Sequence, residues 1–366
     1  MSKMRVCING MTENDQIRGP VRYVYEIAAN LPTSKYEVYL IAGSWQKNIY
    51  VELESKINVR YYNVNRSKIS RALFFMFYMP WFMHKYSIDV YHIPDTNPIP
   101  IFKGKTKIIS TIHDCAEYVV PQRFSYVQAF YRRVISWSQA KLSDSIITVS
   151  HSSKDDIFKY LNVAYAKINV IYNGITKLTN DVSTSDADVS YILYVGVLEK
   201  EKNVERLVEA YALLDESIRC DTKLYLVGRK GNAFKEIQYM VDKYSLSEDV
   251  FIYGYVDDKE LERLYKNAMI FAYLSEYEGF GLPILEAMQY GIPVLTTNNS
   301  SLKEIAGNAA LLTDTCVDQI KNNLSLLLED ENKRDYFSHQ GMCKAKEYSW
   351  EVAAINTGLQ YEHLFQ

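Results

Sequence analysis

The chain has 366 residues, of which 48% are hydrophobic and 23% are charged, and its formal net charge is −3 at pH 7. This length predicts about two domains, each large enough to bury its own core. The composition is ordinary for a globular protein, so it excludes a fibrous or disordered chain but indicates no function.

The cysteine content and the first residues of the chain both indicate in which cellular compartment the protein is found. The five cysteines are scattered, odd in number and without a C-x-x-C pair: Cys7, Cys115, Cys220, Cys316 and Cys343. This usage predicts reduced thiols in the core of a cytoplasmic protein. The first residues, MSKMRVCING, run directly into a strand and lack the basic, apolar and small-residue regions of a signal peptide, so we do not expect secretion.

Charge is divided unevenly along the chain. Residues 1–180 hold 23 Lys and Arg against 13 Asp and Glu, whereas residues 181–366 hold 18 against 31. Most of the basic excess lies in residues 56–107. A basic half favours anionic partners. Because no zinc-finger, RNP-type or basic-zipper pattern accompanies the charge, a phospholipid surface or a lipid-diphosphate acceptor is favoured over nucleic acid.

The first half of the chain alternates apolar strands with amphipathic helices. Helices are expected at residues 19–31 and 126–142, and Ser150 and Ser152 are placed to cap another. His113 follows an expected strand at a position where doubly wound sheets bind ligands, although a lone histidine there is more often structural. The expected strands lie at residues 5–8, 37–42, 59–63, 89–94 and 107–111.

An apolar run extends from Ala72 to Met83, with Lys68, Arg71 and Lys85 beside it. It is shorter than the about 20 apolar residues that span a bilayer. Two interpretations remain open. A helix that is apolar on all sides is usually packed in a core, whereas an exposed aromatic face flanked by cations is typical of a helix at the membrane interface.

The polar segment 178–190, LTNDVSTSDADVS, has no apolar period and is interpreted as an interdomain linker. It contains Asp186 and Asp188, a D-x-D string of the kind that can hold a divalent metal. Because the string lies in a linker and does not close a strand, we expect no metal there.

The second half again alternates strands with helices. Lys202 directly precedes a helix capped by Asn203, where an ammonium group could meet a diphosphate at the helix amides. Arg229 follows a strand. Two interpretations of its side chain remain open: it lies near a nucleotide, or it lies in solvent. Strands are expected at residues 191–197, 223–228, 250–256, 293–297 and 309–313, and further helices at 257–268, 301–307, 317–329 and 333–348.

Residues 275–295, SEYEGFGLPILEAMQYGIPVL, combine a strand end, a glycine turn, a helix and a second strand. Gly279 and Gly281 permit backbone dihedrals that other residues resist, and Pro283 suits the first position of a helix. The amides of Phe280, Gly281 and Leu282 precede that helix, where its dipole favours negative charge. This pattern predicts a phosphate-binding turn.

Two carboxylates flank this turn. Glu278 lies before the helix and Glu286 in its first turn, so the pair can contact polyols on either side of a bound phosphate. The stretch resembles the donor-binding signature of retaining glycosyltransferases of the GT-B fold, the family 4 class. The segments GPVRYVYEI, SDSIITVSHSSKDDIF and YSWEVAAINTGLQYEHL extend the resemblance over nearly the whole chain.

The resemblance implies an α/β GT-B fold, in which two Rossmann-like, doubly wound parallel-sheet domains face each other across a cleft. Residues 1–177 would form the acceptor-binding domain and 191–347 the domain that binds the nucleotide sugar. Residues 178–190 would link them, and a C-terminal helix in 348–366 would cross back to the N-terminal domain.

The resemblance also implies roles in the second domain. Glu278 would lie against the transferred sugar, Glu286 would bond the ribose, and Gly279, Phe280, Gly281 and Leu282 would line the donor phosphates. Lys202 would hold the diphosphate, and Val256 would touch the base. The chain departs from the family at Val197 and Glu201, where relatives carry arginine.

In the first domain the resemblance gives His113 contact with the donor sugar. Gly19 and Arg22 match a G-x-G-R-Y loop that faces the donor phosphate, although Val21 replaces its second glycine.

The activity implied is metal-independent, retaining transfer of a hexose from a nucleoside-diphosphate sugar to a hydroxyl of a glycan acceptor, with no cofactor. A lipid-linked acceptor in cell-surface polysaccharide synthesis fits the basic, aromatic N-terminal half, and places the enzyme in the cytoplasm or on the inner face of the plasma membrane. Two alternatives stay open: a catalytically weak partner subunit and a nucleotide-sugar epimerase of the same fold. No G-x-G-x-x-G follows a strand, which disfavours a dinucleotide-dependent oxidoreductase.

Overall fold

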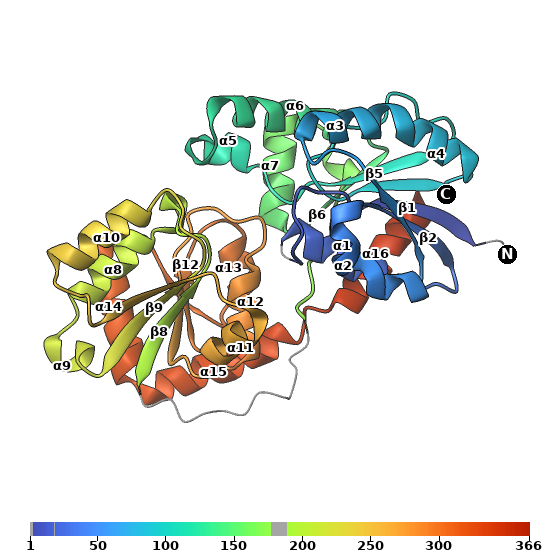
Figure 1. Cartoon of the computed structure of the whole chain (residues 1–366). Coiled ribbons are helices and arrows are strands. Elements are labelled where there is room, and N and C mark those ends of the chain that lie inside the picture. The colour runs from blue at the N-terminus through green and yellow to red at the C-terminus, as the bar shows by residue number, and fades with distance from the viewer. Residues whose placement is uncertain (1–2, 18, 177–188) are drawn as a thin grey trace. The chain divides into compact units, whose positions relative to one another are not determined.

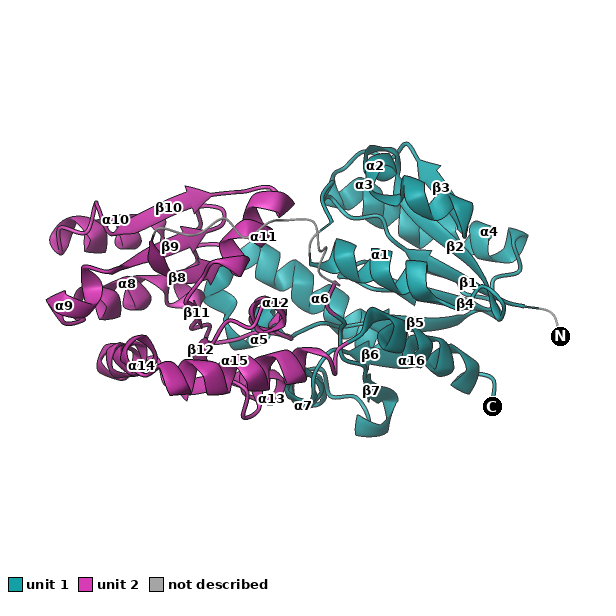
Figure 2. Ribbon diagram, turned by 90° about the horizontal axis from the view of Figure 1, so that it is seen from below, with its two compact units in different colours: residues 1–174, 349–366 teal, residues 175–348 magenta. Residues whose placement is uncertain are grey.

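The computed structural model describes residues 3–17, 19–176 and 189–366. It consists of two compact units (Figures 1 and 2): residues 1–174 with 349–366 form unit 1, and residues 175–348 form unit 2. Each unit contains one parallel sheet, with strand order β3-β2-β1-β4-β5-β6-β7 in unit 1 and β10-β9-β8-β11-β12-β13 in unit 2. The predicted α/β class with two doubly wound parallel sheets is confirmed. Most of the expected linker, with Asp186 and Asp188, lies outside the described residues.

Unit 1 alternates strands and helices in the predicted way. Its strands are β1 (Met4–Asn9), β2 (Tyr36–Gly43), β3 (Asn58–Tyr62), β4 (Val90–Ile93), β5 (Lys107–Thr111), β6 (Ser145–Thr148) and β7 (Ile168–Val170). Its helices are α1 (Pro20–Asn30), α2 (Lys47–Tyr50), α3 (Lys68–Leu73), α4 (Met79–Lys85), α5 (Ala116–Val119), α6 (Tyr126–Leu142), α7 (His151–Leu161) and α16 (Trp350–His363). The predicted bounds of β5 and α6 are confirmed to the residue.

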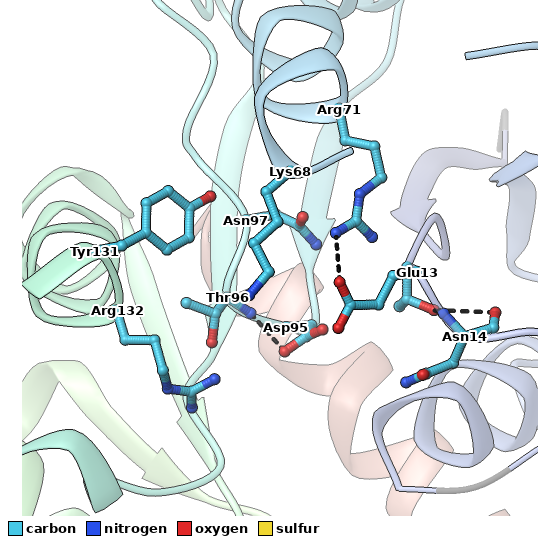
Figure 3. Close-up of a pocket in the computed structure, with 10 residues that line it drawn as sticks. Glu13, Asn14, Lys68, Arg71, Asp95, Thr96, Asn97, Tyr131 and Arg132 are labelled. Atoms are coloured by element: carbon cyan, nitrogen blue, oxygen red, sulfur yellow. Dashed lines mark hydrogen bonds and ion pairs between the residues drawn. The ribbon is translucent and has the colours of Figure 1, made fainter. Parts of the chain in front are cut away.

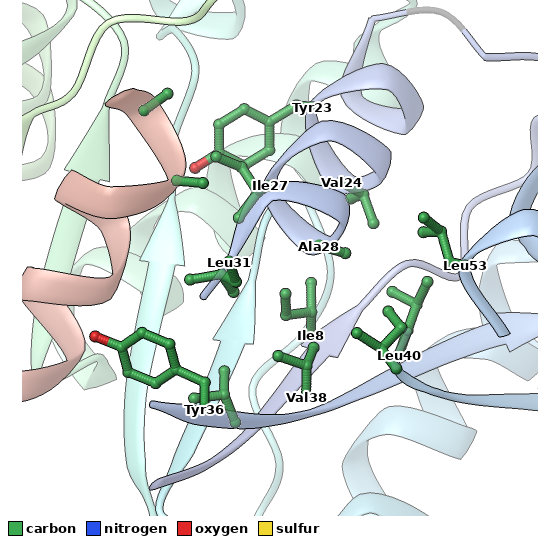
Figure 4. Packing of buried hydrophobic residues seen from close by; sticks show 14 of the residues in the cluster. Ile8, Tyr23, Val24, Ile27, Ala28, Leu31, Tyr36, Val38, Leu40 and Leu53 are labelled. Atoms are coloured by element: carbon green, nitrogen blue, oxygen red, sulfur yellow. The ribbon is translucent and has the colours of Figure 1, made fainter. Parts of the chain in front are cut away.

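The core of unit 1 forms where α1 covers the sheet. Strands of a parallel sheet are buried on both faces and therefore carry continuous apolar runs. Val24 and Ile27 of α1 pack against Ile8 of β1 and against Val38 and Leu40 of β2 (Figure 4), and all five side chains are buried. Helical spacing places Val24 and Ile27 on one face of α1, which is why this face meets the sheet.

The C-terminal helix α16 packs into unit 1 beside α1. Its Tyr361 is fully buried, and the Tyr361 hydroxyl forms a 2.8 Å hydrogen bond with Nδ1 of His92 on β4. The other ring nitrogen of His92 lies 2.7 Å from the hydroxyl of Thr111. Where α16 begins, a Cβ on Gly174 would lie 2.0 Å from the backbone nitrogen of Trp350, so only glycine permits this close approach.

Burial of His92 makes the stability of unit 1 depend on pH. Burial lowers the pKa of His92 from its usual 6.5 to about 3, with His113 adding to the shift. Below pH 6.5 the unfolded chain therefore binds a proton that the folded chain does not. We expect the free energy of unfolding to fall by about 1.4 kcal/mol per pH unit as the pH decreases from about 6 toward 3.

Urea unfolding between pH 7 and pH 4 measures this dependence. The variant His92→Gln removes the titrating group and should show a shallower slope than the wild type. His84→Gln, which changes an exposed histidine of the same unit, is the control and should leave the slope unchanged. Equal slopes for His92→Gln and the wild type would contradict a neutral, buried His92.

Unit 2 repeats the architecture. Its strands are β8 (Ser190–Val195), β9 (Thr222–Val227), β10 (Val250–Gly254), β11 (Ile270–Tyr273), β12 (Val294–Thr297) and β13 (Leu311–Thr313). Its helices are α8 (Val204–Ala212), α9 (Glu216–Arg219), α10 (Phe234–Lys243), α11 (Asp258–Lys266), α12 (Leu282–Gln289), α13 (Ser300–Ala306), α14 (Val317–Glu329) and α15 (Glu331–Ala345). The predicted bounds of α14 are confirmed, whereas α15 begins two residues and ends three residues before the expected range.

The apolar run from Ala72 to Met83 is neither fully buried nor fully exposed. It forms the end of α3, a π-helical turn at Phe74–Tyr78 and most of α4. Phe75 and Phe82 are fully buried, whereas Phe77 and Trp81 are half exposed or more. Among the helices of residues 3–17, 19–176 and 189–366, none has the length and apolar character needed to cross a membrane.

Local predictions that depended on tertiary contacts were wrong in three places. Ser150 caps α7 by accepting from the Ser153 amide, but Ser152 lies inside the helix. Asn203 precedes α8 without a side-chain cap, because its amide group donates to the Leu274 carbonyl. None of the five cysteines forms a disulfide, yet only Cys7 and Cys115 are buried; Cys220, Cys316 and Cys343 are exposed, contrary to the expected core thiols.

Candidate functional site

The carboxyl edge of the second sheet gathers several of the predicted donor residues. Parallel strands end at the same edge, so residues that directly follow neighbouring strands lie near one another. Val256 follows β10, Arg229 follows β9, Lys202 follows β8, and Glu278 follows β11. These four strands are consecutive in the sheet.

Lys202 and Glu278 form an ion pair at this edge. The ammonium group of Lys202 contacts Oε1 of Glu278, and the Tyr273 hydroxyl donates to the same oxygen at 2.5 Å. Lys202 Nζ also lies 3.3 Å from the Tyr273 oxygen. Lys202 is 6% exposed and Tyr273 is 4% exposed, so a cation, a carboxylate and a phenol share a largely dehydrated position.

Two hydrogen bonds between loops bring this cluster together. The Asn203 side chain donates to the Leu274 carbonyl at 2.9 Å, and the Glu276 amide donates to the Glu201 carbonyl at 2.8 Å. The loop after β8 is thereby fixed to the loop after β11. This contact accounts for Asn203, whose side chain joins two loops instead of capping α8.

Glu278 is also held through its backbone. Its amide donates to the Ser300 hydroxyl at 3.1 Å, and its carbonyl accepts from the Ser301 hydroxyl at 2.8 Å. Both serines lie in the first turn of α13. The carboxylate of Glu278 therefore projects from a turn that is fixed on both sides, as an electrostatically preorganised group requires.

The glycine turn ends where α12 begins, one residue before the predicted start. Gly281 occupies the N-cap with a φ of 98°, and a Cβ there would lie 2.6 Å from the Leu302 side chain. Glycine thus meets a conformational and a packing requirement at once. Because α12 starts at Leu282, Glu286 lies in its second turn, not in the first as predicted, and it accepts a 3.2 Å hydrogen bond from the Tyr265 hydroxyl.

The other predicted donor residues of unit 2 differ in burial. Gly279 and Phe280 are buried and Leu282 is half-buried. The side chain of Arg229 is exposed, and Val256 is half-buried. Lys200, the neighbouring basic residue, forms a surface ion pair of 2.5 Å with Glu236 and does not join the cluster.

The predicted site residues of unit 1 lie at the start of α1 and after β5. Gly19 precedes α1 with a φ of 52°, and the half-buried Arg22 lies in its first turn. His113 forms a 2.9 Å hydrogen bond with the Pro94 carbonyl, and its ring meets the Tyr23 ring edge-on at 4.9 Å between centroids. Through Tyr23 the structure connects His113 with the helix of Arg22.

Sequence reasoning did not predict a polar cavity in unit 1. It has a volume of about 100 Å³ and lies between the loops after β1 and β4 and the helices α3 and α6 (Figure 3). Its lining combines cations, carboxylates, amides and a phenol: Thr12, Glu13, Asn14, Lys68, Arg71, Asp95, Thr96, Asn97, Tyr131 and Arg132.

Arg71 is the most buried charged residue of this cavity, with 9% of its side chain exposed. Its terminal nitrogen lies 3.6 Å from the Glu13 carboxylate, whereas its Nε has no hydrogen-bond partner among the described residues. The Gln139 amide group of α6 donates to the carbonyls of Asp95 and Asn97, and so fixes the loop after β4. Polar groups held in this way suit a hydroxyl-rich or anionic ligand.

Two residues, Tyr273 and Arg71, could not be recognised as functional candidates from the sequence, for different reasons. Tyr273 belongs to an apolar strand and gives no signal of a polar contact. Arg71 was noted only as a flanking cation, because its burial depends on the loop of Glu13 and on α6. Within the described residues, no group of three His, Cys, Asp or Glu side chains is arranged to hold a metal ion.

Two family models match the chain. The model described as Glycosyltransferase Family 4 matches residues 17–177, and the model described as Glycosyl transferases group 1 matches residues 177–342. Taken together, the two models cover residues 17–342, which is most of the chain.

Among similar proteins, the O-antigen chain mannosyltransferase B of Escherichia coli is 31% identical over 302 residues, which cover 78% of this chain and 77% of that protein. The O-antigen chain mannosyltransferase RfbU of Salmonella typhimurium is 31% identical over 213 residues, covering 58% and 57%.

Solved structures share the fold over at least 96% of the chain. Anabaena HepE in complex with UDP and glucose superposes with a TM-score of 0.76 at 17% identity, covering 98% of this chain and 100% of that one. WaaG, a glycosyltransferase involved in lipopolysaccharide biosynthesis, superposes with a TM-score of 0.72 at 15% identity, covering 96% and 98%. At these identities the comparison establishes the GT-B fold.

Proposed function

The chain belongs to glycosyltransferase family 4, and from this premise we propose that it transfers mannose, with retention, from a nucleoside-diphosphate mannose to a glycan hydroxyl. The mannosyl group is proposed because the O-antigen relatives carry that activity in their names. Synthesis of a cell-surface polysaccharide at the cytoplasmic side of the membrane is the corresponding process.

The observation that carries the proposal is the cluster of Lys202, Glu278 and Tyr273. A departing nucleoside diphosphate develops negative charge, and a buried ammonium group stabilises that charge more strongly than one in water. Glu278 would bond a hydroxyl of the sugar once Lys202 turns to the phosphates. The ion pair seen in the structure thus keeps both groups in place before the donor arrives.

The proposed reaction breaks the bond between the anomeric carbon and the diphosphate oxygen. A bond from the acceptor oxygen forms on the same face of the sugar, and the acceptor proton passes to the leaving phosphate oxygen. No protein nucleophile is required, and Lys202 supplies the positive charge that a metal ion would otherwise provide. We therefore expect transfer to continue in the presence of EDTA.

The remaining donor contacts are proposed on the family pattern. Glu286 would bond the ribose and Val256 would touch the base. Gly279, Phe280, Gly281 and Leu282 would surround the phosphates, with Arg229 near the nucleotide. In residues 1–177, the proposed acceptor domain, the family pattern assigns donor contacts to Gly19, Arg22 and His113.

The acceptor is proposed to bind the polar cavity around Arg71. Glu13, Asp95 and Asn97 offer acceptors and donors to sugar hydroxyls, and the Arg71 Nε offers a donor that no described residue uses. A cavity of this chemistry suits the first sugar or the phosphate of a lipid-linked glycan.

A calorimetric titration with UDP, GDP, dTDP and ADP, followed by their sugars, tests the proposed function. We expect one diphosphate to bind tightly, GDP-mannose to be the preferred donor, and EDTA to have no effect. Slow donor hydrolysis followed by NMR should release mannose first as the α-anomer, because the donor is α-linked. If a folded protein binds none of these nucleotides, the chain is a catalytically weak partner subunit instead.

A further inference from the structure

Tyr273 contacts both charged members of the cluster at the edge of the second sheet. Its hydroxyl donates to Oε1 of Glu278 at 2.5 Å, and Nζ of Lys202 lies 3.3 Å from its oxygen. An ammonium group only donates and a carboxylate only accepts, whereas a phenol can do both. The hydrogen bonds therefore run in one direction, from Lys202 to Tyr273 and from Tyr273 to Glu278.

The sheet fixes the position of the Tyr273 ring. Tyr273 is the last residue of β11, where it pairs with Thr296 of β12, and the Thr296 hydroxyl donates to its carbonyl at 2.7 Å. Its ring lies nearly parallel to that of Tyr194 on the neighbouring strand β8, with the two centroids 5.9 Å apart. Tyr194 is fully buried and donates to the Val197 carbonyl at 3.0 Å. The strands, not a loop, thus set the position of the Tyr273 hydroxyl.

The two charged residues belong to less regular parts of the chain. Lys202 ends a 3₁₀-helical turn at Lys200–Lys202, and Glu278 lies in the turn before α12. Lysine has a flexible four-carbon stem, so its ammonium group can turn from one anion to another. When Lys202 turns to the donor phosphates, Glu278 loses its cation, which is unfavourable for a carboxylate that is only 16% exposed. The Tyr273 hydroxyl is then the donor that stays on Oε1.

The two carboxylate oxygens of Glu278 are used unequally. Lys202 and Tyr273 both contact Oε1, and within the described part of the chain no hydrogen bond reaches Oε2. Oε2 is therefore the oxygen that can meet a hydroxyl of the donor sugar. Because a carboxylate is planar and rigid, holding Oε1 in place also orients Oε2.

We propose that Tyr273 is a positioning residue for sugar transfer. Its hydroxyl holds Oε1 of Glu278 after Lys202 has moved to the diphosphate, and so directs Oε2 to a hydroxyl of the transferred sugar. This inference rests on the proposed function, which assigns Glu278 to the sugar and Lys202 to the leaving group. A buried tyrosine with only a structural role would affect stability but not kcat.

Hydrolysis of GDP-mannose, the proposed donor, tests the role of the hydroxyl. Tyr273→Phe keeps the ring and its packing, and should lower kcat about tenfold, because even a small displacement of a reacting group can cost as much as about 100-fold. Calorimetric titration should show GDP affinity within about threefold of the wild type, since a residue that acts only in the transition state changes kcat and not binding.

Tyr211→Phe is the matched control. Tyr211 is fully buried in α8, and its hydroxyl donates to the Thr222 carbonyl at 2.6 Å. The control therefore also removes a buried, hydrogen-bonded hydroxyl from unit 2. It should lower thermal stability, as Tyr273→Phe does, but leave kcat within about twofold of the wild type.

A second pair of variants tests whether Tyr273 acts through Glu278. Glu278→Ala removes the carboxylate that the hydroxyl holds, so adding Tyr273→Phe to it should lower kcat by less than about twofold. A loss of about tenfold in both backgrounds would overturn the inference. Wild-type kcat in Tyr273→Phe, or an equal loss of kcat in Tyr211→Phe, would also overturn it. A wild type that binds no nucleotide would instead overturn the proposed function, and this inference with it.

Discussion

Replacing Glu278 by glutamine is expected to lower kcat for sugar transfer by about 100-fold or more while the protein remains folded. The carboxylate is held by the Tyr273 hydroxyl at 2.5 Å and by Lys202, and its backbone is fixed by Ser300 and Ser301. Glutamine keeps the size of the side chain but removes its charge. Loss of one preorganised electrostatic group in an active site typically costs about 10² to 10³ in rate.

Initial rates with saturating donor measure this effect, and thermal unfolding checks the fold. Glu276→Gln is the matched control, because it makes the same change two residues away, outside the contacts with Lys202 and Tyr273. We expect this control to keep kcat within about twofold of the wild type. A Glu278→Gln enzyme with near wild-type kcat would rule out a catalytic role for this carboxylate.

Replacing Lys202 by methionine is expected to lower kcat by about 100-fold or more and to weaken binding of the nucleoside diphosphate. Methionine retains most of the apolar stem that fills the buried position but removes the charge that we assign to the leaving diphosphate. The substitution also leaves Glu278 without its cation. Removing one partner of a buried ion pair typically costs about 3–5 kcal/mol of stability, and here the cost should be lower, because Glu278 is partly exposed and keeps the Tyr273 hydrogen bond.

Two companion variants separate the loss of activity from the loss of stability. Lys200→Met removes a surface cation paired with Glu236, and should change neither diphosphate affinity nor kcat. The double variant Lys202→Met with Glu278→Gln removes both charges, so it should recover thermal stability relative to Lys202→Met alone and remain inactive. Unchanged diphosphate affinity in Lys202→Met would show that another group binds the phosphates.

Local preferences explain why so much of the fold could be predicted. The β5 strand at Lys107–Thr111 and the α6 helix at Tyr126–Leu142 have the expected bounds, because apolar period and boundary residues are local properties. The glycine turn before α12 was likewise predicted, since Gly281 meets a backbone requirement that lies within a few residues.

The apolar run at Ala72–Met83 shows where local information ends. Its composition is compatible with burial in a core and with exposure. Packing against the first sheet determines burial separately for each residue: Phe75 and Phe82 face the core, whereas Phe77 and Trp81 do not.

The sequence by itself determined the alternation of strands and helices, the glycine turn and the two carboxylates around it, because strand and helix periods and glycine conformations are set by neighbouring residues. The two doubly wound parallel sheets were implied by the resemblance to GT-B glycosyltransferases. Only the tertiary structure decided that Tyr273 and Lys202, 71 residues apart, meet Glu278, and that Arg71 is buried in a polar cavity. Such contacts depend on the order of strands in the sheet and on which side chains the packing excludes from water, and neither is a property of neighbouring residues.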